Sequence, residues 1–161
     1  MEKLFIICVD DQREVLSALT SDLEIFEEHV NIEECESSSE VWDLMEKIDE
    51  SGDFVALIIS DQVMPGNSGV DLLKKVKLDG RFKKTRKILL TGQATHQDTI
   101  EAINSAGLDN YIEKPWNKKS LHHIVKVLLT KFIMNSGIEY EQYLEVLDNE
   151  TLYEILRGTT G

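Results

Sequence analysis

The sequence has few cysteines and no apolar run long enough to cross a membrane. Cys8 and Cys35, the two cysteines, lie within apparent strands without CxxC spacing, so buried reduced thiols are favoured over a disulfide or a metal site. Every apolar run falls short of the ~18 residues of a membrane span. The N-terminus also lacks a charged segment followed by a long apolar run and a small-residue cleavage site. We therefore expect a cytoplasmic protein that does not enter the membrane.

Positive charge is also scarce. The chain carries 17 lysines and arginines against 30 acidic residues, a net charge of −13. Nucleic acids and anionic lipids require positive charge to displace their counterions, so no nucleic-acid partner is expected. The one basic stretch, Lys74 to Lys87, is better explained as a solvated helix face and loop than as a docking surface for an acidic partner.

What is present is an ordinary globular composition. Of the 161 residues, 42% are hydrophobic and 29% are charged, which allows one sizeable core and an appendage. We predict a domain over residues 1–134 and a helical extension, or a linker to an output domain, over residues 135–161. The extension has six acidic residues against Arg157. Its broken apolar stripe can pack on the domain, pair with a second copy, or lead into a further domain.

Short apolar runs alternate with amphipathic segments along the first 134 residues. The runs predict five strands: Leu4–Val9, Val30–Cys35, Phe54–Ile59, Ile88–Leu90 and Tyr111–Ile112. Helices are expected between them, the first capped by Asp11, the second by Ser37, the fourth by Thr95 and Asp98 and stopped by Gly107, and a last one covering Lys119–Met134. This alternation predicts a doubly wound α/β fold, a parallel sheet with helices on both faces, whose ligands bind beyond the carboxyl ends of the strands.

Acidic residues follow two of these strands. Asp10 and Asp11 come after the first strand, and Asp61 comes after the third. If the two strands are neighbours, three carboxylates meet at one edge, where their repulsion is costly unless a cation lies among them. All-oxygen ligands in this small number suit Mg²⁺, with Mn²⁺ as a substitute.

An alcohol and an ammonium group follow two further strands. Thr91 comes after the fourth strand, and Lys114 comes after the fifth, directly before Pro115, where a cis peptide bond is plausible. Both groups suit a phosphoryl oxygen. An aspartate beside a metal and a lysine can attack phosphorus to form an acyl phosphate, so the pattern favours phosphoacceptor chemistry at Asp61.

These residues resemble the receiver domains of two-component response regulators, the CheY-like superfamily. The resemblance covers about residues 3–134 and is carried by Asp10-Asp11, DQVMPGNSG from Asp61 to Gly69, Thr91 in LLTG, and Tyr111 with Lys114-Pro115 in YIEKPW. It implies a flavodoxin-like five-stranded sheet of order 2-1-3-4-5. It also implies that Asp61 accepts the phosphoryl group from a histidine kinase or phosphotransfer protein in a Mg²⁺-dependent reaction.

The resemblance further implies roles for single residues. Asp11 would ligate the metal directly, Asp10 mainly through water, and the Val63 carbonyl would complete the set. Thr91 and Tyr111 would form the switch that changes the surface from about Gln97 to Met134, the fourth helix, fifth strand and fifth helix, and so control a homodimer or an output partner. Val63 and Gln93 hold positions that influence the lifetime of the acyl phosphate.

Two other functions compete with a phosphorylated switch. A haloacid-dehalogenase-like phosphatase also uses an aspartyl phosphate, but it requires an acid two residues after the nucleophile, where Asp61 has Val63. A scaffold on the same fold that is not phosphorylated is the second alternative. Nucleotide binding is disfavoured because the glycine-containing loop before Gly69 matches neither GxxxxGK[ST] nor GxGxxG. We expect a signalling domain that is not an enzyme in its own right.

Overall fold

A five-stranded parallel sheet forms the centre of the molecule, with strand order β2-β1-β3-β4-β5. The computed structural model describes residues 2–92 and 96–158. The strands are β1 (Leu4–Val9), β2 (Asn31–Cys35), β3 (Phe54–Asp61), β4 (Arg86–Thr91) and β5 (Asn110–Glu113). The central strands are almost entirely buried, because helices cover both of their faces. The predicted fold and strand order are therefore confirmed.

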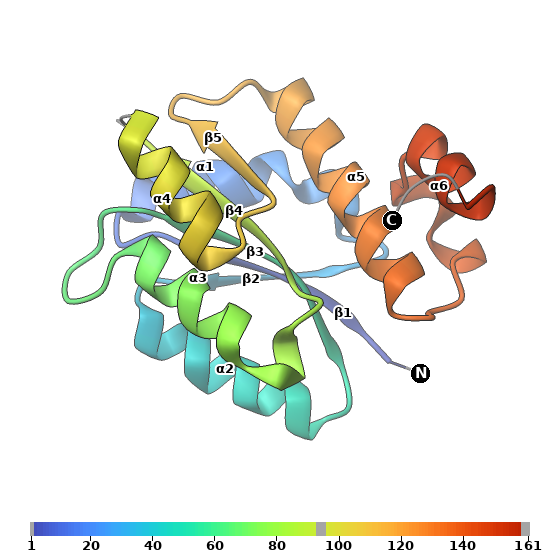
Figure 1. Cartoon of the computed structure of the whole chain (residues 1–161), viewed down its shortest axis with the longest axis horizontal. Helices are drawn as coiled ribbons and strands as arrows, with labels where there is room; N and C mark the ends of the chain where they lie inside the picture. Colours follow the sequence, from blue (N-terminus) through green and yellow to red (C-terminus); the bar gives the residue numbers. More distant parts are fainter. Residues whose placement is uncertain (1, 93–95, 159–161) are drawn as a thin grey trace.

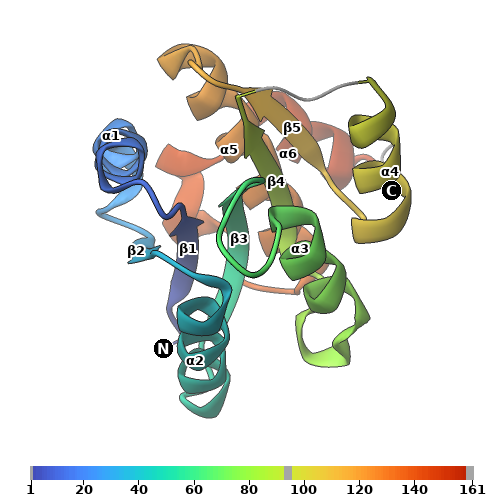
Figure 2. The same cartoon turned by 90° about the vertical axis from the view of Figure 1, so that its left-hand side faces the viewer.

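The helices form one layer on each side of this sheet (Figures 1 and 2). They are α1 (Arg13–Asp22), α2 (Ser38–Glu50), α3 (Gly69–Leu78), α4 (His96–Ala106), α5 (Lys118–Asn135) and α6 (Asn149–Leu156), with 3₁₀ turns η1 (Glu24–Phe26), η2 (Gly80–Phe82) and η3 (Glu141–Val146). Buried side chains of α1 and α5 share one apolar cluster, and those of α2, α3 and α4 share the other. The amphipathic faces read from the sequence thus become two separate cores.

Helix boundaries agree with the capping residues in some places and differ in others. The Ser37 side chain accepts a hydrogen bond from the Glu40 backbone N–H at 3.2 Å, and Gly107, with φ +62°, follows the end of α4. The cap predicted at Asp11 is wrong, because Gln12 is the N-cap residue and makes no side-chain cap. Asp10 accepts from the Gln12 N–H instead, at 2.8 Å. The cap predicted at Thr95 lies outside the described residues.

The C-terminal extension packs on the layer formed by α1 and α5. It turns at Gly137, where φ is +69°, and continues through η3 into α6, which lies beside α5 (Figure 1). Four of its apolar side chains are buried within the α1/α5 cluster: Tyr143, Val146, Leu147 and Leu152. The Asp148 N–H also donates to the Thr130 hydroxyl at 2.9 Å. Of the three arrangements expected for the extension, the single chain shows the first, in which the extension packs on the domain.

The two cysteines are free and buried, as expected. Burial raises the pKa of the Cys8 thiol strongly, and it raises the pKa of Cys35 to about 12. Both side chains therefore remain thiols and act as small apolar groups. Among residues 2–92 and 96–158, no helix has the length and apolar character needed to cross a membrane.

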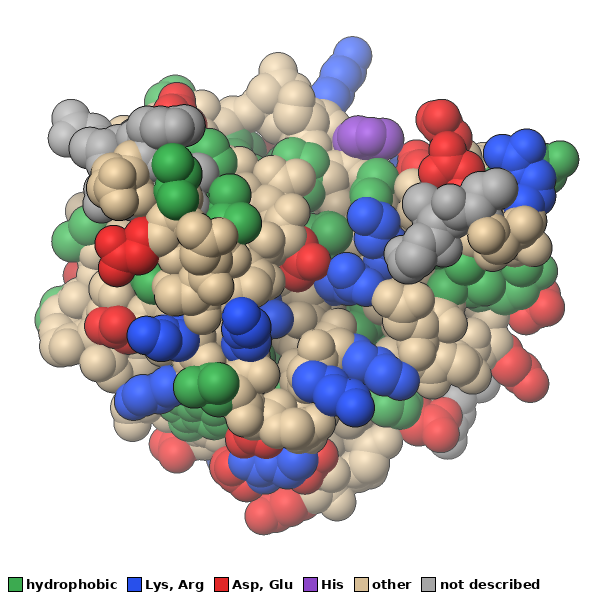
Figure 3. Space-filling model, in the orientation of Figure 1, with side chains coloured by type: hydrophobic (Ala, Val, Ile, Leu, Met, Phe, Trp, Pro, Cys, Tyr) green, Lys and Arg blue, Asp and Glu red, His purple; other side chains and the backbone are tan. Residues whose placement is uncertain are grey.

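The basic stretch is partly neutralised within the chain. Arg81 pairs with Glu46 at 2.7 Å and with Asp79 at 2.9 Å, and Arg86 pairs with Asp109 at 3.1 Å. The lower part of the face in Figure 3, near α3 and η2, accordingly shows acidic side chains among the basic ones. Pairs of this kind at the surface contribute little to stability, but they reduce the positive charge that a partner would meet.

Candidate functional site

Three carboxylates meet at the carboxyl edge of the sheet. Strands β1 and β3 are neighbours in which Val9 pairs with Ser60, so the residues that follow them are brought together. One oxygen from each of Asp10, Asp11 and Asp61 lies within 4.8 Å of the others. Asp10 is fully buried and Asp61 is 5% exposed, whereas Asp11 faces solvent. The sequence placed these acids at one edge, and the structure brings them together.

Lys114 lies between two of these acids. Its Nζ donates to Asp61 Oδ1 at 2.6 Å and to Asp10 Oδ2 at 3.2 Å. The lysine follows β5, two strands from β3, and therefore reaches across the end of β4. Its backbone N–H donates to the Thr91 carbonyl at 2.8 Å, and the Lys114–Pro115 bond is cis. The contact between the Lys114 and Asp61 side chains joins residues 53 positions apart in the chain.

Burial and neighbouring charges act in opposite directions on the pKa values of Asp61 and Lys114. Burial raises the pKa of Asp61 above its ordinary value, and the nearby Asp10 charge adds to this, although the hydrogen bond from Lys114 lowers it. Burial acts to lower the pKa of Lys114, but the hydrogen bond and charge of Asp61, with those of Asp10, outweigh it and raise that pKa. Lys114 therefore stays protonated, and an additional positive charge beside Asp61 would lower the pKa of Asp61.

The other proposed site residues differ in their placement. Thr91 ends β4 and is 3% exposed, one residue beyond Leu90, which pairs with Asp61. Tyr111 is partly buried against the α2/α3/α4 cluster, and its hydroxyl donates to Glu113 Oε1 at 3.0 Å. The Val63 side chain projects into solvent, 77% exposed. Gln93 lies outside the described residues.

The donor set fits a hard divalent cation with incomplete protein ligation. The grouped atoms are carboxylate oxygens, which Mg²⁺ and Mn²⁺ prefer. A cation at this point would offset the repulsion that the buried Asp10 and Asp61 carboxylates exert on each other. Because Lys114 already contacts Asp61, a metal ion and an ammonium could act on the same carboxylate and on a phosphoryl group attached to it.

Gly69 supports this site in a way that the sequence did not indicate. It begins α3, and a Cβ added there would lie 2.2 Å from the Asp61 carbonyl oxygen and 2.9 Å from Leu89 Cδ1. Its N–H donates to the Gln62 carbonyl at 2.9 Å, and the Gln62 side chain accepts from the Val70 N–H at 2.9 Å. The loop between Asp61 and α3 is thus closed by one backbone hydrogen bond and by one that the Gln62 side chain accepts. A glycine in a loop motif was the single available signal, and it does not reveal such a close approach.

Comparison with known proteins places this arrangement in a family. A sequence model of the response regulator receiver domain matches residues 6–126. Chemotaxis protein CheY1 of Helicobacter pylori strain J99 is 38% identical over 96 residues, which cover 60% of this chain and 73% of that protein. The hydrogenase transcriptional regulatory protein HoxA of Cupriavidus necator is 32% identical over 103 residues, which cover 64% of this chain and 20% of that much longer protein.

Solved structures agree with the sequence matches. The CheY-like response regulator receiver domain protein from Methanospirillum hungatei JF-1 superposes with a TM-score of 0.68 at 27% identity, covering 84% of this chain and 99% of that one. The receiver domain of an HD domain-containing protein from Pseudomonas fluorescens Pf-5 gives a TM-score of 0.72 at 23% identity, covering 83% and 99%. Because the Pseudomonas domain is 23% identical to this chain, its similarity supports the fold alone. With its sheet order, its acidic edge and these matches, the chain belongs to the response regulator receiver domain family of two-component signalling.

Proposed function

We propose that Asp61 accepts a phosphoryl group from a histidine kinase or a phosphotransfer protein. The observation that carries this proposal is the contact of Lys114 Nζ with Asp61 Oδ1 at 2.6 Å inside a cluster of three carboxylates. An isolated buried aspartate is a weak nucleophile toward an anionic phosphoryl group, because the two negative charges repel. Cations held beside the carboxylate remove this barrier.

The proposed reaction transfers the phosphoryl group from a histidine nitrogen of the donor to an oxygen of Asp61. An Asp61 carboxylate oxygen forms a bond to phosphorus while the bond from phosphorus to the donor's histidine nitrogen breaks, and that nitrogen keeps the electron pair. Asp11, Asp61 and the Val63 carbonyl would hold Mg²⁺ or Mn²⁺ directly, with Asp10 acting mainly through water, and the bound ion would supply positive charge to the phosphoryl oxygens. Lys114 exchanges its contact with the Asp61 carboxylate for one with a phosphoryl oxygen.

The remaining residues convert the new charge into a change of shape. The Thr91 hydroxyl donates to a phosphoryl oxygen, and Tyr111 moves with it, which alters the surface of α4, β5 and α5 and so controls association with a second copy or an output partner. The acyl phosphate carries about −1.5 to −2 charge where the Asp61 carboxylate carried one negative charge, and it adds new phosphoryl oxygens as hydrogen-bond acceptors, which together are enough to bias a two-state loop. Val63 and Gln93 influence how fast water removes the phosphoryl group.

A phosphorylation assay tests this function. The protein is incubated with acetyl phosphate and Mg²⁺ and then weighed intact by mass spectrometry. We expect one phosphoryl adduct in the wild type, none in Asp61→Asn, and an unchanged adduct in Asp43→Asn, which alters an exposed aspartate of α2. Omission of Mg²⁺ should remove the adduct as well.

Two results would contradict the proposal. A wild-type protein that takes no phosphoryl group and keeps the same association state with beryllofluoride would favour an unphosphorylated scaffold. Rapid turnover of phosphate esters would instead indicate a phosphatase. The side chains after the nucleophile do not support the latter, because the Gln62 side chain is bound to the Val70 N–H and Val63 is apolar.

A further inference from the structure

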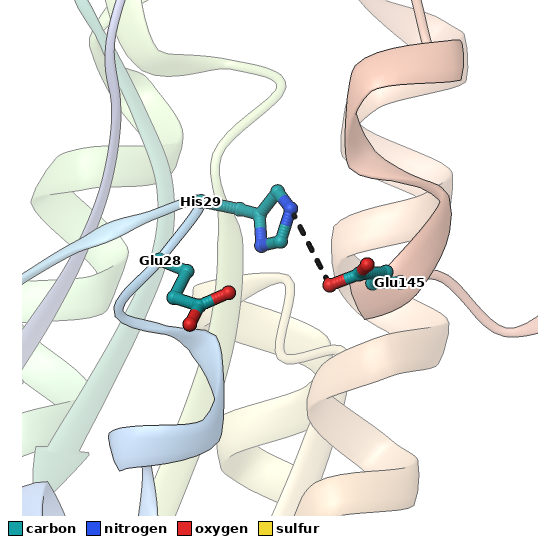
Figure 4. Close-up of side chains that lie close together, drawn as sticks. All are labelled: Glu28, His29 and Glu145. Carbon is teal, nitrogen blue, oxygen red and sulfur yellow. Dashed lines mark ion pairs between the residues drawn. The ribbon is translucent and has the colours of Figure 1, made fainter.

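A second group of potential metal ligands lies at the opposite end of the sheet from Asp61. Glu28 and His29 belong to the turn that leads into β2, and Glu145 belongs to η3 of the extension. One potential ligand atom from each of the three side chains lies within 4.8 Å of the others. Figure 4 shows the imidazole of His29 between the two carboxylates. The group therefore joins the domain to the extension.

The distances suit ligands of a shared ion better than direct hydrogen bonds. His29 Nε2 lies 3.8 Å from Glu145 Oε2, beyond hydrogen-bonding distance. Two ligands of one tetrahedral ion with bonds of ~2.0 Å lie roughly 3.3 Å apart, so the side chains, whose ligand atoms lie within 4.8 Å of one another, must rotate toward each other to bind one ion. The two residues come from separate segments, so chain connectivity alone does not account for their meeting.

The other ring nitrogen is a second, independent observation. His29 Nδ1 is buried and has no hydrogen-bond partner among the described residues. In Figure 4 this edge of the ring faces the carboxylate of Glu28. A buried polar atom without a partner costs free energy, so Nδ1 is the one ring nitrogen that we assign to the ion, and binding there would remove that cost. The carboxylates can be reached from solvent, because the Glu145 side chain is 78% exposed.

The donor atoms select the class of ion. An imidazole nitrogen with carboxylates suits Zn²⁺ and related divalent transition metals, whereas carboxylates alone suit Mg²⁺. We propose that Glu28, His29 and Glu145 form a site for a Zn²⁺-like ion, completed by water, that ties the extension to the domain. This site is distinct from the acidic edge, where Asp10, Asp11 and Asp61 offer oxygen alone.

Binding should hold the extension in place. Glu28 and His29 precede β2, and Glu145 lies in the turn whose neighbours Tyr143 and Val146 are buried in the α1/α5 cluster. An ion that bridges these segments stabilises the docked form. When the extension separates from the domain, an ion at Glu28 and His29 loses Glu145 as a ligand and is bound more weakly.

Calorimetric titration with Zn²⁺ in excess Mg²⁺ tests the proposal, since Mg²⁺ then competes for the acidic edge. We expect one Zn²⁺ per chain in the wild type and affinity reduced by at least about tenfold in Glu145→Gln, as loss of a ligand requires. Glu141→Gln, an exposed residue of the same turn, and His123→Asn, beside Asp148, should bind as the wild type does. Asp11→Asn should also retain binding.

Hydrogen exchange supplies a second measurement that does not depend on affinity alone. Zn²⁺ should slow exchange over residues 141–156 in the wild type but not in Glu145→Gln. Because Glu145 is exposed, this variant is expected to fold even if His29→Asn does not. The proposal is overturned if the wild type binds no Zn²⁺ in excess Mg²⁺, if Glu145→Gln binds as tightly as the wild type, or if exchange in the extension does not respond. None of these results bears on phosphorylation of Asp61.

Discussion

At the scale of single residues, Lys114 and Asp61 determine the charge balance of the acidic edge. Lys114 Nζ contacts both Asp61 and Asp10, and its own side chain is 20% exposed. The two carboxylates are nearly inaccessible to water, so they depend on this ammonium when no metal ion is present. Removal of Lys114 leaves two buried negative charges without their cation, whereas removal of the Asp61 charge relieves its repulsion with Asp10, so the two changes should affect stability differently.

Replacement of the lysine should destabilise the metal-free protein. In Lys114→Ala the Asp10 and Asp61 carboxylates lose a charged hydrogen-bond donor, and we expect the free energy of unfolding to fall by about 2 kcal/mol at neutral pH. Urea unfolding in a chelator measures this loss, and Mg²⁺ should restore part of it. Lys74→Ala, at an exposed position of α3, is the control. An equal loss in both variants would show that the contact with Asp61 contributes nothing.

The raised pKa of Asp61 predicts a specific pH dependence. Because its pKa in the folded chain lies above the ordinary value of 3.8, the folded state binds more protons than the unfolded state in the interval between the two. Stability of the metal-free protein should therefore fall as pH rises through that interval, and Asp61→Asn should not share this fall. Unfolding of both proteins from pH 3.5 upward in a chelator measures the difference. If the stability of Asp61→Asn relative to the wild type did not increase with rising pH, the raised pKa would not belong to Asp61.

At the scale of secondary-structure elements, the start of α3 is fixed by its contact with the end of β3. Ser68 caps the helix by accepting from the Asp71 N–H at 3.1 Å, and Gly69 follows, directly against the Asp61 carbonyl. The sequence predicted a helix in this region from its apolar spacing. It did not predict that the first residue of the helix must lack a side chain, because that requirement comes from β3 and from Leu89 of β4.

Substitution of Gly69 should therefore be costly. In Gly69→Ala the new methyl group would overlap backbone atoms of Asp61, and we expect a loss of about 1–3 kcal/mol in unfolding free energy, together with slower phosphorylation of Asp61. Gly80→Ala is a matched control because a Cβ at that position meets no atom within 4 Å. Chemical denaturation and the acetyl phosphate assay measure the two effects. Equal behaviour of the two variants would show that α3 can shift freely.

At the scale of the whole molecule, the extension shares its core with the domain. Leu147 is 4% exposed within the α1/α5 cluster, whereas Leu144, three residues earlier, is 47% exposed. The broken apolar stripe expected over residues 135–161 includes both of these leucines, and the sequence pattern does not distinguish them. Tertiary packing decides which one is buried.

This difference predicts how the chain unfolds. Leu147→Ala should lower the unfolding free energy by about 2–4 kcal/mol in a single transition, because it leaves a cavity in the common core. Leu144→Ala should change it by less than about 0.5 kcal/mol. Thermal unfolding followed by circular dichroism and by tryptophan fluorescence measures both effects. A separate early transition in Leu147→Ala would indicate that the extension melts independently of the sheet.

The sequence alone determined the alternation of strands and helices and the edge at which the proposed site residues lie. An acidic residue directly after an apolar strand, as at Asp10 and Asp61, lies at the carboxyl edge of any parallel sheet, because the carboxyl ends of all its strands share that edge. Tertiary structure alone decided that Asp10 rather than Asp11 accepts from the start of α1, that Gly69 lies against Asp61, and that His29 meets Glu145. These contacts join segments far apart in the chain or depend on exact backbone placement, and neither hydrophobic periodicity nor local propensity carries that information.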